Sequence, residues 1–357
     1  MPRTGQHFRS FYIVSINCIY IQSVLFVKIN SMKVLVTGGA GYIGSFMVKR
    51  LLDDDHEVFV ADSLERGHET SLDKRATFLK GNLLDKSFVE EIFTQHSYDC
   101  VMHFAAFIAV GESMQHPGLY FRDNVFTTVS LLDAMKEHGV NKFIFSSTGT
   151  VYGTPTVNPI PETHSKNPEN PYAESKYMVE KILHWYYVVH GIGSAVLRYF
   201  NASGAALDGT LGEDHDPETH LIPNAIKAAL NNSEFTLFGD DYDTRDGTCI
   251  RDYIHVLDLV EAHVVTLKKL QESNGEYVYN VGTGRGSTNK EVIEMVKKNS
   301  GIDFPITIKE RRPGDVAETV ADATKIKQEL GFEPKYSDLE TIVKTAWEWH
   351  KSHANKQ

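Results

Sequence analysis

Short apolar runs alternate with longer amphipathic stretches through the first 200 residues of the chain. Such short runs, rich in Val, Ile and Phe, are typical of buried parallel strands, and stretches with a helical period are typical of the helices that cover them. Strands are predicted at residues 33–37, 57–61, 77–80, 100–104, 142–146 and 194–198. Helices are predicted at residues 45–53, 86–95, 117–138 and 172–190. The alternation predicts an α/β fold of the Rossmann type, a doubly wound parallel sheet with helices on both faces.

Past about residue 199 the alternation loosens, and prolines and glycines separate shorter elements. Residues 253–255 and 277–281 still have the composition of short strands. We therefore expect a Rossmann domain at residues 32–199 and a smaller α/β lobe at residues 200–350 that is interleaved with it. Ligands of such a fold bind at the carboxyl ends of the parallel strands, where the strand order reverses.

Residues 1–31 do not continue this pattern. Arg3 and Arg9 precede a largely apolar stretch at residues 11–27, which serine, asparagine and glutamine interrupt. The stretch has no small-residue cleavage site, and it is shorter and more polar than the about 20 apolar residues of a membrane helix. We expect residues 1–31 to be an extension outside the fold, and a membrane anchor is the alternative interpretation.

The first predicted strand runs into Gly38 and then into Gly39-Ala-Gly41-Tyr-Ile-Gly44, a G-x-G-x-x-G pattern at the start of a predicted helix. Glycine permits the sharp turn and lets a pyrophosphate approach main-chain N–H groups, where the helix dipole favours it. Asp62, at the end of the second strand, is spaced for the adenosine ribose, and its charge would repel a 2′-phosphate. The pattern predicts bound NAD, and a tight turn that binds nothing is the alternative.

Small and polar residues also follow the third, fourth and fifth predicted strands, at the edge where a dinucleotide would lie. Each position alone could be an ordinary strand end, but their recurrence favours a cofactor cleft. The residues predicted to contact NAD are Gly38, Gly41, Tyr42, Ile43, Gly44, Asp62, Ser63, Leu64, Asn82, Leu83, Phe104, Ala105, Ala106, Ser146, Tyr172 and Lys176.

Pro171-Tyr-Ala-Glu-Ser-Lys176 carries the strongest catalytic signal. Proline favours the start of a helix, so Tyr172 and Lys176 should lie one turn apart on one face. The ammonium, together with the positive charge of oxidised nicotinamide, is expected to lower the phenol pKa from its usual value of about 10. Tyr172 could then remove a hydroxyl proton while hydride leaves the same carbon, with the Thr148 hydroxyl between the substrate oxygen and Tyr172. A surface Tyr–Lys pair is the alternative.

Composition excludes several other classes of function. A net charge of −11 argues against a nucleic-acid partner. The three cysteines are widely separated and fit neither a disulfide framework nor a zinc spacing, which predicts a reducing cytoplasm. The sixteen histidines form no H-x-x-x-H pair on one helix face, so no metal site is predicted.

Motifs extend over nearly the whole chain: Thr37-Gly-Gly-Ala-Gly-Tyr-Ile-Gly44, Phe104-Ala-Ala106, Val110-Gly-Glu-Ser113, Ser146-Ser-Thr-Gly-Thr-Val-Tyr-Gly153, Pro171-Tyr-Ala-Glu-Ser-Lys176, Arg198-Tyr-Phe-Asn201, Arg251-Asp-Tyr-Ile-His255 and Arg311-Arg-Pro-Gly-Asp315. With these motifs the chain from Met32 to about His350 resembles the extended short-chain dehydrogenases/reductases, and most closely the UDP-glucose 4-epimerases.

The resemblance implies a tightly held NAD that takes hydride from C4 of a UDP-hexose while Tyr172 takes the O4 proton. The 4-keto sugar then turns over and receives the hydride on its other face. An arginine fork suits phosphate oxygens, and an aspartate suits ribose hydroxyls. The resemblance also implies a homodimer through the helices at residues 117–138 and 172–190. It adds Asp123, Asn124 and Tyr199 to the NAD contacts, and it assigns the UDP-sugar to Thr148, Tyr172, Phe200, Asn201, Arg251, Arg312, Asp315 and Thr319.

The chain departs from the family pattern at a few of these positions. Asn82 stands where an adenine-contacting Asp is frequent, and Ile108 replaces a Lys that is common near the nicotinamide ribose. Asp123 precedes Asn124 where two asparagines are usual, so which of the two contacts NAD stays open. Thr319 replaces a bulky Tyr that some members carry beside the 2-position of the sugar, which implies activity on UDP-N-acetylhexosamines as well.

Other functions on the same scaffold remain open from the sequence. The preferred sugar is not fixed, because xylose, arabinose and uronic forms differ from glucose by one substituent. A nucleotide-sugar dehydratase would need a carboxylate after Thr148, where the chain has Gly149 and Thr150. A decarboxylase also stays open, and so does a non-catalytic NAD-binding sensor, although a sensor would have no reason to keep Tyr172 and Lys176.

Overall fold

The computed structural model describes Met1, residues 31–312 and residues 314–354. Seven parallel strands form its main sheet, in the order β10-β6-β5-β4-β1-β2-β3. Because β1 has β2 on one side and β4 on the other, the strand order reverses at β1, as in a doubly wound sheet. The predicted fold class is confirmed. The strands are β1 (Lys33–Thr37), β2 (Glu57–Asp62), β3 (Thr77–Lys80), β4 (Cys100–His103), β5 (Lys142–Thr148), β6 (Gly193–Tyr199) and β10 (Glu276–Val281).

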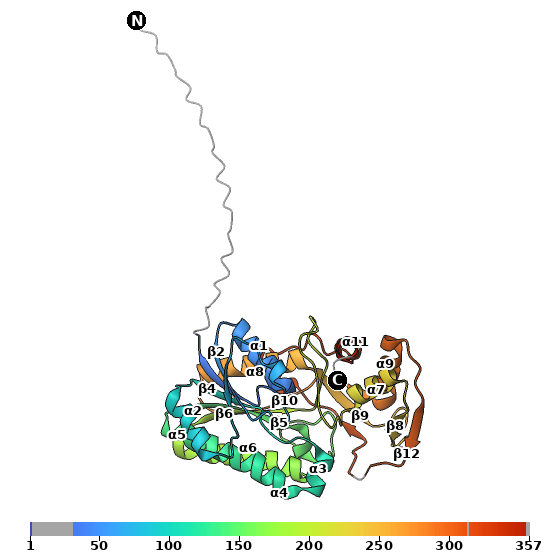
Figure 1. Ribbon diagram of the computed structural model, residues 1–357, viewed down its shortest axis with the longest axis horizontal. Coiled ribbons are helices and arrows are strands. Elements are labelled where there is room, and N and C mark those ends of the chain that lie inside the picture. The colour runs from blue at the N-terminus through green and yellow to red at the C-terminus, as the bar shows by residue number, and fades with distance from the viewer. Residues whose placement is uncertain (2–30, 313, 355–357) are drawn as a thin grey trace. The chain divides into compact units, whose positions relative to one another are not determined.

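Helices cover both faces of this sheet (Figure 1). On one face, α1 (Tyr42–Asp53), α8 (Val256–Glu272) and α10 (Thr324–Leu330) share an apolar core with β1, β2, β6 and β10. On the other face, α2 (Lys86–Gln95), α5 (Thr127–Glu137) and α6 (Pro171–His190) pack over Leu35, Phe59, Phe143 and Phe145. Burial on both faces explains why the strands are nearly uniform apolar runs.

Shorter elements make up the rest of the described chain. A second sheet contains β7 (Asn201–Ser203), β9 (Ile250–His255), β11 (Gly286–Thr288) and β13 (Glu318–Thr319), while β8 (Phe235–Phe238) pairs with β12 (Ile306–Lys309). The helices α7 (Leu221–Asn231), α9 (Asn289–Ser300) and α11 (Leu339–His353) pack together around a separate apolar core. Strand β10 and helix α8 lie beyond residue 199 in the sequence but belong to the main sheet and its cover.

Some predicted elements differ from the observed ones. Helix α1 begins at Tyr42 rather than Ser45, because the carbonyl of Gly41 already accepts the N–H of Ser45. The helix predicted at residues 117–138 is interrupted: α4 (Pro117–Tyr120) leads into a π-helical turn at Phe121–Phe126, and α5 follows.

Two threonines explain the π-helical turn. The hydroxyls of Thr127 and Thr128 donate to the carbonyls of Asp123 and Asn124, four residues earlier. Side-chain hydroxyls that bond these carbonyls compete with the backbone N–H groups, and the helix widens there. Further connecting elements are α3 (Val110–Gln115) and two 3₁₀ turns at Glu69–Ser71 and Gly149–Tyr152.

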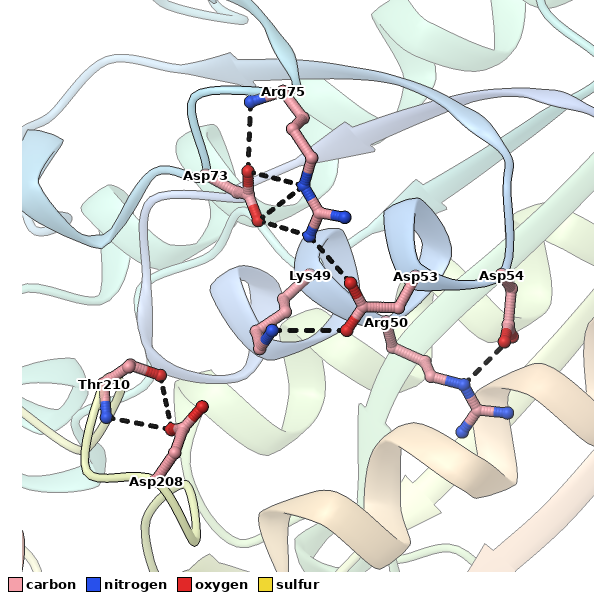
Figure 2. Close-up of polar contacts among 8 residues, drawn as sticks. All are labelled: Lys49, Arg50, Asp53, Asp54, Asp73, Arg75, Asp208 and Thr210. Carbon is pink, nitrogen blue, oxygen red and sulfur yellow. Dashed lines mark hydrogen bonds and ion pairs between the residues drawn. The ribbon is translucent and has the colours of Figure 1, made fainter.

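Ion pairs tie the loop before β3 to the side of α1 (Figure 2). Arg75 donates to both carboxylate oxygens of Asp73 and, 2.8 Å away, to Oδ1 of Asp53. Lys49 contacts the other oxygen of Asp53 at 3.2 Å, one helical turn away. Exposed pairs of this kind contribute little individually to stability.

The predicted N-terminal extension, residues 1–31, falls almost entirely outside the described residues. Ser31, its last residue, is described, and its hydroxyl donates to the carbonyl of Asp55 at 2.8 Å. Among the described residues, none of the helices has the length and apolar character that crossing a membrane requires.

Candidate active site

The glycine-rich turn after β1 has the backbone geometry that a pyrophosphate site requires. Gly38 has a φ of +72°, and a Cβ there would lie 2.5 Å from the amide nitrogen of Ala105. A Cβ on Gly44 would lie 2.1 Å from the carbonyl oxygen of Gly38. Helix α1 follows directly from Gly41, which has no side chain to cap the first N–H groups. These N–H groups are therefore available to an anion.

Asp62 lies at the end of β2 beside this turn. Its carboxylate accepts the N–H of Ala40 at 3.0 Å and the N–H of Leu64 at 2.8 Å, so it joins the glycine turn to the loop after β2. Ser63 in the same loop accepts the N–H of Glu65. After β3, the side chain of Asn82 accepts the N–H of Leu84, and Leu83 is buried. The predicted adenosine-contacting residues thus stand at the carboxyl ends of neighbouring strands.

The segment after β4 approaches the same turn. The N–H groups of Phe104 and Ala105 both donate to the carbonyl of Thr37, at 2.9 and 3.1 Å. Small residues are needed here because Ala105 contacts Gly38 so closely. Ala106 follows in the same half-buried stretch, whereas Ile108 is 41% exposed.

Asp123 and Asn124 have different environments. The amide oxygen of Asn124 accepts the N–H of Phe107, and its two amide hydrogens go to the carbonyl of Phe107 and the hydroxyl of Ser175, at 2.8 to 3.0 Å. Asn124 is therefore fully engaged within the protein and joins the segment after β4 to α6. Asp123 pairs with Arg122.

The predicted catalytic residues come together at the junction of β5 and α6. The side chain of Asn170 caps the first turn of α6, and Pro171 opens the helix, so Tyr172 and Lys176 lie one turn apart. Lys176 is 2% exposed, and its ammonium donates to the carbonyl of Ser146 at 2.9 Å. The hydroxyl of Thr148, at the end of β5, lies close enough to that of Tyr172 to lower its pKa. Tyr199 at the end of β6 is hydrogen-bonded to Ser146.

Burial shifts the pKa values of this pair in the chain without NAD. Burial raises the pKa of Tyr172 to about 12, and the hydrogen bond from Thr148 offsets only part of that rise. Burial also lowers the pKa of Lys176 to about 7. The predicted lowering of the phenol pKa, by Lys176 together with the positive charge of oxidised nicotinamide, concerns the chain with NAD bound and stays a prediction.

A buried polar network that the sequence analysis missed holds the same helix. Glu180, one turn beyond Lys176, accepts the hydroxyl of Ser147 at 2.6 Å and the Nε–H of Arg198 at 2.9 Å. Arg198 also donates to the hydroxyl of Tyr152 at 2.9 Å, and Tyr152 donates to Asn280. The spacing of four residues from Tyr172 through Lys176 to Glu180 was the available signal. All three face β5 and β6, so they fix the position of α6 together.

His103, at the end of β4, is a second buried group that the sequence analysis did not single out. Its ring contacts the hydroxyl of Thr37 at 2.6 Å and that of Thr128 at 3.0 Å. Burial, and then the charge of Lys176, lower the pKa of His103 to about 3, so the ring is neutral. Because Thr128 donates to the carbonyl of Asn124, this chain of contacts runs from the glycine turn towards α6.

The residues predicted to bind the UDP-sugar lie in and around the second sheet. Asn201 donates to the carbonyl of Asp252 at 2.9 Å, and Phe200 packs on Gly149 just after Thr148. Arg251 and Thr319 are paired in the register of β9 and β13.

Arg251 and Arg312 are held differently. The guanidinium of Arg251 donates to the carbonyls of Ile250 and Val316, at 2.9 and 2.7 Å. Arg312 is paired with Asp315 at 2.9 Å and is largely exposed. The two predicted ligands Arg312 and Asp315 thus contact each other, and Arg251 is fixed by main-chain carbonyls.

Comparison with known proteins agrees with this geometry. The family model described as GDP-mannose 4,6 dehydratase matches residues 35–345. A UDP-glucose 4-epimerase from Lactobacillus helveticus is 47% identical over 323 residues, which cover 90% of this chain and 98% of that protein. The chain belongs to the UDP-glucose 4-epimerases within this family. The resemblance that the motifs indicated is confirmed.

Solved structures of UDP-glucose 4-epimerases superpose on nearly the whole described chain. The enzyme from Brucella ovis in complex with NAD is 44% identical, with a TM-score of 0.86 over 88% of this chain and 97% of that one. The enzyme from Bifidobacterium longum in complex with NAD⁺ and UDP is 38% identical, with a TM-score of 0.87 over 91% of this chain and 100% of that one.

A feature after β5 fits a member of the UDP-glucose 4-epimerases better than a dehydratase. A Cβ on Gly149 would lie 2.9 Å from the ring of Phe200, so a carboxylate side chain would displace that ring. Thr150 directs its hydroxyl to that of Thr148 at 3.0 Å. Elimination of water from a sugar needs an acid and a base beside the reacting carbons. In this chain the two positions after Thr148 are Gly149, which has no side chain, and Thr150, which has a hydroxyl, so neither supplies a carboxylate.

Proposed function

We propose that this protein is an NAD-dependent isomerase that interconverts UDP-glucose and UDP-galactose by transient oxidation at C4. One observation carries the proposal: the Tyr172 hydroxyl meets Thr148 at the carboxyl end of β5, one helical turn from the buried Lys176. This edge of the sheet also carries the glycine turn and Asp62. Family membership and the relatives found with NAD support the same function.

The residues present fit a dinucleotide. The open N–H groups after Gly41 suit a pyrophosphate, and Asp62 suits ribose hydroxyls. When bound, NAD supplies the acceptor that takes hydride from C4 and later returns it. We propose that the residues predicted to contact NAD, from Gly38 to Tyr199, bind this cofactor.

In the proposed reaction Tyr172 acts as the proton acceptor and donor. The O4–H bond breaks as its proton passes to the phenolate oxygen of Tyr172, and the C4–H bond breaks as hydride leaves, which forms the 4-keto sugar. Return of hydride to the opposite face and of the proton to O4 gives the epimer, so no net oxidation occurs. Thr148 hydrogen-bonds both oxygens, and a charged Lys176 favours the phenolate.

Rotation of the keto sugar requires a firm grip on UDP and a loose one on the hexose. We assign that grip to Asn201, Arg251, Arg312 and Asp315, with Phe200 beside the sugar. Arg312 and Asp315 now pair with each other at an exposed position, so substrate would have to replace this contact. Thr319 is small and paired with Arg251, which supports acceptance of a 2-acetamido group and hence UDP-N-acetylhexosamines.

The remaining assignments follow from the same function. We propose residues 32–199 as the NAD-binding domain and residues 200–350 as an interleaved UDP-sugar lobe. A homodimer through the helices at residues 117–138 and 172–190 is supported by large apolar side chains exposed there, which would be covered by a second copy. These side chains are Phe121, Phe126, Trp185, Val188 and Val189.

Two buried free cysteines and the net negative charge support a cytoplasmic enzyme without a nucleic-acid partner.

The decisive experiment incubates purified protein with UDP-galactose, with and without added NAD, and separates the products. We expect UDP-glucose to appear without added NAD and Tyr172→Phe to form almost none. Parallel reactions with UDP-xylose and UDP-glucuronate test the other 4-epimerases, and accumulation of a 4-keto-6-deoxy sugar would indicate a dehydratase. Failure to form UDP-glucose even with added NAD would refute the proposal.

A further inference from the structure

The motif Val110-Gly-Glu-Ser113 has no role in the proposed reaction, but its glutamate makes a contact that spans one strand of the main sheet. Glu112, in α3 after β4, accepts a hydrogen bond from the guanidinium of Arg66 at 2.8 Å. Arg66 lies in the loop that follows β2. Because β1 stands between β2 and β4 in the sheet, this ion pair joins the two segments on either side of the carboxyl end of β1.

The loop after β2 packs directly on the glycine turn. The N–H of His68 donates to the carbonyl of Ala40 at 3.0 Å, and the N–H of Ala40 donates to Asp62 at the start of the loop. A Cβ on Gly67 would lie 2.8 Å from the carbonyl carbon of Ala40, so a side chain at this position would displace the turn. Arg66, the preceding residue, therefore begins beside the turn whose open N–H groups suit a pyrophosphate.

The side chain of Arg66 has partners in two further segments of the chain. It donates to the carbonyl of Asp216, in the loop between β7 and α7, at 3.3 Å. Its guanidinium carbon lies 5.4 Å from the centre of the Phe107 ring, a distance at which a cation and an aromatic ring attract each other. Phe107 is itself fixed by Asn124, which bonds both its N–H and its carbonyl. Arg66 is thus held by the segment after β4 and by the loop before α7.

Glu112 is held from its other side by Tyr120. The hydroxyl of this buried tyrosine lies 2.9 Å from Oε2 of Glu112, whereas Arg66 contacts Oε1. The ring of Tyr120 packs edge-on against that of Tyr172, with 6.4 Å between the ring centroids. The ion pair therefore connects the part of the sheet edge that carries Asp62 with the part that carries the proposed catalytic tyrosine.

This position suggests what the ion pair does. A dinucleotide in such a fold binds outside the carboxyl ends of the strands, with its pyrophosphate at the first turn between strand and helix. The Arg66–Glu112 contact joins the segments on both sides of that turn, so it would restrict the departure of a bound dinucleotide. We propose that Arg66 and Glu112 form a clasp that slows the release of NAD, an inference that rests on the proposed NAD-dependent function.

Two other interpretations of the contact make different predictions. An ordinary surface ion pair would contribute little to stability and nothing to cofactor release. An Arg66 that acted only by attracting the phosphates of NAD would act more strongly once it was freed from Glu112. Neutralising Glu112 would then slow the release of NAD, whereas the clasp predicts that release becomes faster.

The test loads full-length protein with radiolabelled NAD⁺, removes free nucleotide, and follows the loss of bound label after excess unlabelled NAD⁺ is added. Arg66→Ala and Glu112→Gln should each speed this exchange by about two- to fivefold, the size expected for one partly exposed ion pair. Glu112→Gln keeps an acceptor for Tyr120, so it removes the charge with little change in shape. The double variant should exchange no faster than the faster single variant, because both substitutions break the same contact.

The matched control is Arg75→Ala. Arg75 is 49% exposed, close to the 45% of Arg66, and it also forms ion pairs beside α1, but these pairs do not span β1. This variant should exchange NAD⁺ as the natural chain does. Unchanged exchange in Arg66→Ala, or slower exchange in Glu112→Gln, would overturn the clasp and leave the proposed function intact. A natural chain that retained no labelled NAD⁺ would refute both.

Discussion

The ammonium of Lys176 and the carbonyl of Ser146 form a 2.9 Å hydrogen bond that joins α6 to β5. Two further contacts join the same helix and strand: Tyr172 with Thr148, and Glu180 with Ser147. Three consecutive residues of β5, Ser146 to Thr148, therefore contact three turns of α6. The position of the reactive phenol depends on all three contacts, and each can be tested separately.

Replacing Tyr172 with phenylalanine removes the hydroxyl that exchanges a proton with the sugar O4 in the proposed reaction. General acid–base catalysis contributes roughly 10²- to 10⁴-fold, so kcat for UDP-galactose should fall by at least about 100-fold. The matched control is Tyr187→Phe on the same helix, which should keep its activity. Binding of NAD, followed by absorbance of the purified protein, should be unchanged in both. A Tyr172→Phe variant with normal turnover would contradict the role.

Lys176 should make the stability of the nucleotide-free chain depend on pH. Burial lowers its pKa to about 7, whereas the unfolded chain has the ordinary value of 10.5. Between these values the unfolded state binds more protons, so the free energy of unfolding should rise with pH across this window. Below the pKa of Lys176 in the folded chain, Lys176 is protonated in both the folded and the unfolded state. The free-energy cost of burying its charge is then present in full.

Lys176→Met removes this contribution. The free energy of unfolding of Lys176→Met, minus that of the natural chain, should be largest near pH 6 and should fall towards pH 10. Lys181→Met, an exposed lysine of the same helix, should show no such trend. Urea unfolding over this pH range measures both. A constant difference between Lys176→Met and the natural chain would show that Lys176 keeps its ordinary pKa.

The alternation of strands and helices made the main sheet predictable, because parallel strands buried on both faces must be apolar throughout. The glycine turn and the Tyr172–Lys176 pair were predictable for the same kind of reason, since local spacing fixes their geometry. The π-helical turn at Phe121–Phe126 was not, because it depends on hydroxyls of Thr127 and Thr128 that a helical pattern tolerates equally well.

Contacts between distant segments were also beyond the sequence. Glu180 and Arg198 are ordinary helix and strand residues until the fold buries them against each other. Spacing gives the neighbour of a group but not its burial, and burial raises the pKa of Tyr172 in the chain without NAD. Strand β10 joins the main sheet beside β6 from far along the chain, which short-range patterns cannot reveal.

Glu180 is predicted to be a positioning residue, because it touches Arg198 and Ser147 rather than the reacting atoms. Glu180→Gln leaves the buried Arg198 without its counter-charge, which should lower the free energy of unfolding by about 3 kcal/mol. It should also lower kcat by about tenfold with little change in KM, because α6 loses one of its contacts with β5. The control is Glu174→Gln, an exposed carboxylate of the same helix. Equal losses in both variants would contradict a specific role for Glu180.

Thr319 should control acceptance of a 2-acetamido group. It lies opposite Arg251 in the register of β9 and β13 and is half-buried, so a larger side chain there would project beside the proposed substrate. Thr319→Tyr should lower the rate on UDP-N-acetylglucosamine relative to UDP-glucose by about 10- to 200-fold, as expected when a pocket loses space for one substituent. Thr319→Ser, which keeps the pocket open, should leave the ratio nearly unchanged. Relative kcat/KM values for the two substrates measure the effect, and an unaltered ratio in Thr319→Tyr would show that this position does not face the sugar.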